Sequence, residues 1–296
     1  MSQALDFLSQ RFAMPGLSFE SGAGGLTTVK VRTAIASGEL YLQGAHVTAW
    51  QPNGHDPVLW LSRASNYEKG KPIRGGVPIC LPWFGPNATD ASAPAHGSAR
   101  VIEWEFVKAD ETDDGGIAIQ LQAFIAPFQV RFGVEFGREL KMTLETSLPS
   151  GHSGPEKFED ALHTYFAVGD IRHVSIWGLE DASYIDKMDN AQIKLASGSP
   201  IEFSDETDRV YFDTLATSML VDHGRDRMIT VGKSGSKSTV VWNPWINKSI
   251  RMPDFGDNEW PEMVCIETAN VGKNAIDLSP GESHSTTAMI SVVMID

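Results

Sequence analysis

Two short segments carry side chains that could perform acid/base chemistry. Residues 161–166 read ALHTYF and residues 263–270 read MVCIETAN, so a histidine and a carboxylate each interrupt a largely apolar stretch. Alternation with period two places His163 and Tyr165 on one face of a strand. A lone strand histidine is more often a structural residue than a catalyst, so this segment alone is a weak signal. Glu267 is costly to desolvate unless it is paired, hydrated in a pocket or functional, which makes it a candidate for proton transfer.

Two arginines and a histidine lie close together in an earlier part of the chain. Residues 72–84 read PIRGGVPICLPWF and residues 94–100 read PAHGSAR, which contain Arg74, His96 and Arg100. The planar guanidinium fork suits a dianionic phosphate, so the two arginines could converge on one. Separate surface ion pairs are the other interpretation, and composition alone favours them.

Other motifs are incomplete. GAGGLT at 22–27 lacks the last glycine of a dinucleotide fingerprint, and GKS at 232–234 lacks the upstream glycine of a P-loop. The eight histidines include no HxH or HxxxH pair that would indicate a local metal site. We therefore expect neither a metal nor a cofactor.

Charge and cysteine content limit the partners and the compartment. The formal net charge is −14, and no run of Lys and Arg offers the basic surface that binds nucleic acids or anionic membranes. Cys80 and Cys265 are far apart, which is typical of a reducing compartment. No secretory signal is readable at the N-terminus, and no apolar run reaches the roughly 18 residues of a membrane span. We expect a cytoplasmic protein that binds neither nucleic acid nor membrane.

The elements that must position these residues are mostly strands. The 27 glycines and 16 prolines are spread along the chain and leave little room for long helices. Helical periodicity is confined to residues 4–12. Alternating or apolar runs predict strands near 28–35, 40–42, 47–50, 117–121, 136–144, 162–168, 219–221, 239–242, 263–266 and 287–295. So many strands without a linker predict an all-β fold in which residues 1–296 form one large β-sandwich domain.

Several of these segments together resemble one known family. The blocks IRGGVPICLPWFGP, AHGSAR, LHTYF, VWNPWINKSIRMPDFGD and MVCIETANVG resemble, in this order, the glucose-6-phosphate 1-epimerase family of the aldose 1-epimerase superfamily. The similarity begins at GAHVTAWQP, residues 44–52, and covers most of the chain. It implies a β-sandwich of the galactose mutarotase type.

The resemblance also implies a reaction and its catalytic groups. Such enzymes interconvert the α and β anomers of a hexose 6-phosphate without a cofactor. Glu267 would be the general base that takes the proton of the anomeric hydroxyl, and His163 the general acid that protonates the ring oxygen.

A substrate-binding set follows from the same resemblance. Arg74 and Arg100 would contact the phosphate, whereas His96 and Asp208 would line the sugar pocket. Ser98 stands in AHGSAR where related sequences are expected to carry an aromatic residue, which affects the pocket wall and the sugar preference more than the chemistry.

Alternative functions remain open from the sequence. An aldose 1-epimerase for unphosphorylated sugars would share the acid/base pair without needing converging arginines. A non-catalytic carbohydrate-binding module would need stacking aromatics but no poised histidine and carboxylate. A glycoside hydrolase would need two carboxylates, of which only Glu267 is evident. We expect a monomer whose partner is a small hexose phosphate.

Overall fold

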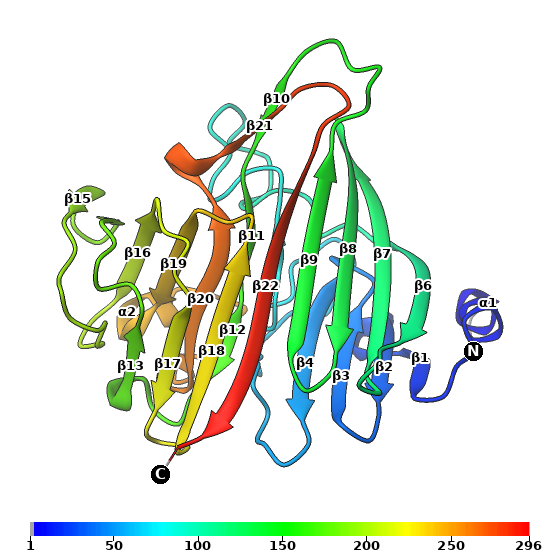
Figure 1. Ribbon diagram of the computed structural model, residues 1–296, viewed down its shortest axis with the longest axis horizontal. Helices are drawn as coiled ribbons and strands as arrows, with labels where there is room; N and C mark the ends of the chain where they lie inside the picture. The colour runs from blue at the N-terminus through cyan, green and yellow to red at the C-terminus, as the bar shows by residue number, and fades with distance from the viewer. Residues whose placement is uncertain (1–2, 296) are drawn as a thin grey trace.

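The computed structural model describes residues 3–295, in which antiparallel sheets dominate (Figure 1). One eight-stranded sheet crosses the front of the view in the order β13-β17-β18-β22-β9-β8-β7-β6. Its strands are β6 Glu105–Glu111, β7 Ile117–Ile125, β8 Phe128–Phe136, β9 Leu140–Ser147, β13 Val174–Trp177, β17 Ser218–Asp222, β18 Arg227–Ser234 and β22 Ser283–Met294.

A second eight-stranded sheet lies behind the β17–β18 half of the first (Figure 1). Its order is β15-β14-β16-β19-β20-β11-β5, and β12 also pairs with β20. The strands are β5 Ile79–Cys80, β11 Asp160–Leu162, β12 Tyr165–Ala167, β14 Tyr184–Asp186, β15 Gln192–Lys194, β16 Thr207–Phe212, β19 Ser238–Asn243 and β20 Met263–Asn270.

A four-stranded sheet lies behind the other half of the front sheet, and a two-stranded ribbon pairs β10 with β21 (Figure 1). The strands are β1 Leu17–Ser21, β2 Thr27–Arg32, β3 Ala36–Tyr41, β4 His46–Pro52, β10 Glu156–Phe158 and β21 Ile276–Leu278. The helices are short: α1 Gln3–Arg11, α2 Trp245–Ser249, and the 3-10 turns η1 Ala23–Gly25, η2 Ile171–His173, η3 Trp260–Glu262 and η4 Gly272–Asn274. No helix within residues 3–295 combines the length and the apolar character needed to cross a membrane.

The sheets pack face to face around a shared hydrophobic core. Leu40 of β3 and Phe132 of β8 are both fully buried in it. Trp50 of β4 donates its indole N–H to the carbonyl oxygen of Gly137, at the turn between β8 and β9, over 3.1 Å. Gly38 lies so close to the Phe136 ring that an added Cβ would overlap the ring. This face-to-face packing confirms the expected all-β sandwich.

Both faces of β20 are covered, and this decides where the site lies. All eight residues of the strand are buried. Val264 and Ile266 belong to the main core, whereas Met263 and Cys265 pack in a separate cluster around Trp242. Because side chains alternate along a strand, the second face is free to carry functional groups while the first holds the sandwich together.

The expected helix is confirmed within one residue at each end, but some strand boundaries are wrong. The single strand expected at 136–144 is two strands, because Gly137 and Glu139 bond to each other across a tight turn. The strand expected at 28–35 ends at Arg32. The run 162–168 is broken between β11 and β12. Several strands, including β1, β16 and β18, are not among those expected.

Candidate active site

His163 lies where the pairing along β20 is interrupted. β11 ends at Leu162, opposite Thr268, and β12 begins at Tyr165, opposite Cys265. Between them the His163 backbone N–H donates instead to the Pro78 carbonyl oxygen over 3.0 Å. The imidazole stacks on the Tyr165 ring, with centroids 4.7 Å apart and planes 8° from parallel. This stacking fixes the plane of the imidazole and agrees with the predicted shared face.

Glu267 projects from the second face of β20 toward the same imidazole. Its Oε1 lies 3.3 Å from His163 Nε2, and the Glu267 side chain is only 1% exposed. Over the described residues, His163 Nδ1 and Glu267 Oε2 have no hydrogen-bond partner although both are buried. Buried polar atoms without partners are rare in folded proteins and point to a site that takes a polar ligand.

Burial moves the pKa values of the pair in opposite directions. The pKa of His163 lies well below its usual value, because burial penalises the imidazolium and His96, Arg74 and Arg100 add to the penalty. The pKa of Glu267 lies well above its usual value, because burial penalises the carboxylate and Asp208 adds repulsion. The pair therefore favours one shared proton, held on Glu267, with a neutral imidazole.

The pair lies at a cavity of about 470 Å³, a size suited to a small metabolite. The aromatic ring of Trp242 lies edge-on to His163, with centroids 6.2 Å apart. The residues lining the cavity are Arg74, Phe84, Gly85, Pro86, His96, His163, Tyr165, Lys187, Asp208, Val240, Trp242, Lys248, Met252 and Glu267. Five of the six residues singled out in the sequence thus meet in one place, and Arg100 is not in this set.

His96 offers a hydrogen-bond donor to the cavity. Its backbone has the left-handed φ of 64°, and its Nδ1 accepts from the Gly85 N–H over 3.3 Å. Burial, with Arg100 and Lys187 nearby, lowers the pKa of His96 to about 3. A neutral imidazole that accepts at Nδ1 carries its proton on Nε2, so Nε2 is the donor.

The two arginines take different positions. Arg74 donates through Nη1 to the Tyr165 hydroxyl over 2.9 Å and through Nε and Nη2 to the Asp254 carboxylate over 3.0–3.2 Å. Arg100 is buried, and its Nη2 donates to the Ala95 carbonyl oxygen over 2.6 Å. Arg74 therefore supports the ring that His163 stacks on, while Arg100 supports the backbone next to His96.

Asp208 reaches the cavity from β16 and is flanked by two lysines that sequence reasoning missed. Lys187 Nζ lies 3.3 Å from Asp208 Oδ1, and Lys248 Nζ lies 4.0 Å from Asp208 Oδ2. Nothing in the local sequence separates these lysines from ordinary solvated ones. Only the tertiary structure brings them to the cavity.

One group of side chains has a metal-like donor set. Ligand atoms of His163, Cys265 and Glu267 all lie within 4.8 Å of one another. Burial and the neighbouring Glu267 raise the pKa of the Cys265 thiol far above its usual value, so this thiol is protonated.

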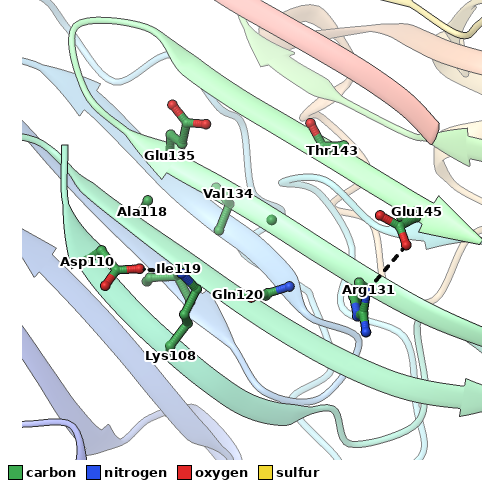
Figure 2. A pocket seen from close by; sticks show the side chains of 11 residues that line it. Lys108, Asp110, Ala118, Ile119, Gln120, Arg131, Val134, Glu135, Thr143 and Glu145 are labelled. Atoms are coloured by element: carbon green, nitrogen blue, oxygen red, sulfur yellow. Dashed lines mark hydrogen bonds and ion pairs between the residues drawn. The ribbon is translucent and has the colours of Figure 1, made fainter. Parts of the chain in front are cut away.

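A contrasting hollow of about 230 Å³ lies on the outer face of the front sheet, over β6 to β9 (Figure 2). Four of its charged side chains pair with each other, Lys108 with Asp110 at 2.7 Å and Arg131 with Glu145 at 3.6 Å, while Glu135 pairs with Lys141 at 2.8 Å. These four side chains are largely exposed. Mutually paired, solvated charges of this kind are typical of an ordinary sheet surface.

Comparison with known proteins identifies the family. The family model described as Aldose 1-epimerase matches residues 28–291. The chain belongs to the aldose 1-epimerase family. The match spans every strand that contributes a residue to the cavity, so the His163–Glu267 pair lies within the matched residues.

Among other members of the family are curated relatives and a solved structure. An Escherichia coli K12 protein named "Putative glucose-6-phosphate 1-epimerase" is 37% identical over 77% of this chain and 78% of its own. A Cenchrus ciliaris protein of the same name is 32% identical over 91% and 85% of the two chains. The crystal structure of "a putative mutarotase (YeaD) from Salmonella typhimurium" superposes with a TM-score of 0.87 at 31% identity, over 95% of each chain. The expected mutarotase-type sandwich is therefore confirmed.

Proposed function

We propose that this member of the aldose 1-epimerase family interconverts the α and β anomers of hexose 6-phosphates, with glucose 6-phosphate as the preferred substrate. The observation that carries the proposal is the buried His163–Glu267 pair, 3.3 Å apart at a metabolite-sized cavity. The names of the relatives in Escherichia coli and Cenchrus ciliaris support the choice of substrate.

Ring opening needs one base and one acid. The Glu267 carboxylate takes the proton from the anomeric O1, a C1=O1 double bond forms, and the C1–O5 bond breaks as the His163 imidazolium gives its proton to O5. Rotation about C1–C2 then presents the other face of the aldehyde. The reverse proton transfers close the ring and restore both side chains, so no cofactor is consumed.

The proton must move within the pair before this reaction can begin. Burial favours protonated Glu267 and neutral His163, whereas catalysis uses the carboxylate and the imidazolium. These two states differ by one proton transferred across the 3.3 Å contact. A sugar hydroxyl that donates to the unpartnered Glu267 Oε2 stabilises the carboxylate and so favours the transfer.

The remaining residues bind and orient the sugar. His96 Nε2 donates a hydrogen bond to a ring substituent, and the Asp208 carboxylate accepts one from a sugar hydroxyl. Arg74 and Arg100 supply positive potential for the phosphate, Arg74 from the cavity wall and Arg100 from behind it. Binding energy from a phosphate remote from C1 holds the ring in register with the acid and the base.

An unphosphorylated aldose is the second candidate substrate, because the acid/base pair alone does not require a phosphate. The cavity wall distinguishes the two. Arg74, Lys187 and Lys248 bring three cations to it, each paired with a carboxylate, and a phosphate offers these cations a further anionic partner that a neutral sugar lacks. The phosphorylated substrate is therefore the better fit.

We further propose that the chain works as a monomeric, single-domain enzyme of the cytoplasm. Both cysteines are unpaired and buried within the described residues, which suits a reducing compartment. Light scattering behind a sizing column tests the monomer, since a mass of twice 32.3 kDa would contradict it.

Exchange spectroscopy tests the reaction and the substrate together. Two-dimensional NMR at equilibrium measures the rate at which α and β anomers interconvert, for glucose 6-phosphate, glucose and galactose in parallel. We expect a large acceleration over buffer for the phosphorylated sugar alone. Acceleration of the free sugars alone would move the protein to the unphosphorylated substrates, and no acceleration of any sugar would contradict catalysis.

A further inference from the structure

The hydrogen bonds of the two arginines leave the phosphate short of direct donors. Arg74 donates hydrogen bonds through Nε and Nη2 to Asp254 and through one Nη1 hydrogen to the Tyr165 hydroxyl. A bidentate guanidinium clamp on a phosphate requires two free N–H groups on one edge. Arg74 has no such edge left, because its Nε–Nη2 edge is held by Asp254. Arg100 donates through Nη2 to the Ala95 carbonyl oxygen and keeps a buried Nε without a partner, but among the described residues it does not line this cavity.

Lys187 is a cation with spare donor capacity at the same cavity. It follows β14, and its backbone N–H donates to the Asp208 carbonyl oxygen over 2.9 Å, which fixes it beside β16. Its ammonium lies 3.3 Å from Asp208 Oδ1 and 5.0 Å from the centre of the Phe84 ring. An ammonium has three N–H donors, and this contact occupies one of them.

Lys248 approaches the same carboxylate from the other side. It lies in α2, with its ammonium 5.8 Å from the centre of the Trp242 ring. The ammonium pairs with Glu206 at 2.9 Å and lies 4.0 Å from Asp208 Oδ2. About one third of the side chain is exposed, so the charge can turn toward an anion that enters the cavity.

We propose that Lys187 and Lys248 are the residues that directly bind the phosphate of the substrate, one on each side of Asp208, and that they set the preference for phosphorylated sugars. This assignment rests on the proposed function and deepens it. Arg74 and Arg100 then attract the phosphate by their positive charge without bonding to it. They also position the site, Arg74 through Tyr165 and Arg100 through the backbone beside His96.

Asp208 explains how two lysines can be kept in place when the cavity is empty. Its carboxylate lies near both ammonium groups and offsets their mutual repulsion. When the sugar arrives, the phosphate takes over as the counter-ion of the ammonium groups. The carboxylate oxygens are then free to accept a sugar hydroxyl, so one binding event satisfies both charges.

Length-matched neutral variants test the proposal. Lys187→Met and Lys248→Met keep an unbranched stem against the aromatic rings but remove the ammonium. We expect each to raise KM for glucose 6-phosphate about tenfold, or about 1.4 kcal/mol. The double variant should raise it about a hundredfold, with a smaller effect on kcat, since Lys187 acts on Glu267 only through its charge.

Lys194→Met is the matched control. Lys194 lies in β15, is as exposed as Lys187, and pairs with two carboxylates, Asp186 at 2.9 Å and Asp189 at 3.0 Å, but it does not line the cavity. We expect its KM for glucose 6-phosphate to equal that of the wild type. Inorganic phosphate, used as a competitive inhibitor, should lose potency in the two cavity variants and keep it in this control.

Binding measured without turnover separates this proposal from the proposed function. Isothermal titration of glucose 6-phosphate into the wild type and the variants reports the phosphate site even if the wild type catalyses no exchange. Weakened binding in the cavity variants supports the proposal. Wild-type affinity and wild-type KM in the double variant, in protein shown by circular dichroism to be folded, would overturn it while leaving the acid/base assignment intact.

Discussion

Each member of the proposed acid/base pair is one proton away from the state that catalysis needs. Burial favours a neutral His163 and a protonated Glu267. The reaction needs the opposite arrangement of the same single proton, so the pair is ready without exchanging protons with solvent. Groups this close titrate as a unit, with one macroscopic pKa below and one above the working range.

The pH dependence of kcat/KM tests this description of the pair. We expect a bell-shaped profile. The acid limb, where the pair takes a second proton, lies well below pH 6.5 because the pKa of His163 is lowered. The alkaline limb, where the pair loses its last proton, lies well above pH 4.5 because the pKa of Glu267 is raised.

Rates of glucose 6-phosphate exchange between pH 4 and pH 10 provide the measurement. The stability of the protein at each pH is the control, since unfolding would also lower the rate. An activity that falls by half near pH 6.5 on the acid side, as an exposed histidine would give, contradicts the shared-proton pair.

At the scale of elements, the segment that carries Arg74 is anchored on β4. The Val77 backbone N–H donates to the Val47 carbonyl oxygen over 2.8 Å, and His46 Nε2 lies 2.7 Å from the Gly75 carbonyl oxygen. His46 is fully buried, and burial lowers its pKa to about 4. The neutral imidazole thus joins the four-stranded sheet to one wall of the cavity.

This anchor makes the fold sensitive to acid. Between pH 6.5 and about 4 the unfolded chain binds a proton on His46 and the folded chain does not, so the free energy of unfolding falls as the pH falls. The full contribution is present above pH 6.5. We expect His46 to account for about 3 kcal/mol of loss across this window, at 1.36 kcal/mol per pKa unit.

Urea unfolding at pH 7 and pH 4.5 measures that loss. His46→Gln keeps an N–H donor for the Gly75 carbonyl oxygen but cannot titrate, so it should lose about 2–3 kcal/mol less than the wild type between the two pH values. His163 and His96 contribute in the same direction to both proteins and cancel in the comparison. An equal loss in the variant would contradict the assignment to His46.

Elements differ in how well the sequence predicts them, for physical reasons. Strands with one apolar face, such as β7, alternate clearly, and the helix α1 has a readable period. The turn at Gly137 escapes notice because apolar residues flank it on both sides and continue the pattern. β16, whose sequence is TDRVYF, is missed because its buried residues do not alternate, and Asp208 is placed only by resemblance.

At the scale of the whole molecule, the sandwich separates stability from chemistry. Val264 and Ile266 on one face of β20 pack into the core shared by the sheets, while Glu267 on the other face meets His163 at the cavity. Local sequence patterns predict this two-sided burial poorly. A strand buried on both faces has a nearly unbroken apolar sequence, which does not show which face carries the site. The lysines at Asp208 come from segments about 60 residues apart, so only the fold brings them together.

The most direct test of the central claim is anomer exchange of glucose 6-phosphate with variants of the pair. Glu267→Gln keeps the shape of the side chain and removes the base, and His163→Ala removes the acid. We expect each to lose at least about a hundredfold in exchange rate, the usual contribution of a positioned acid or base, while circular dichroism and urea unfolding show a folded protein. Wild-type exchange rates in either folded variant would contradict the account.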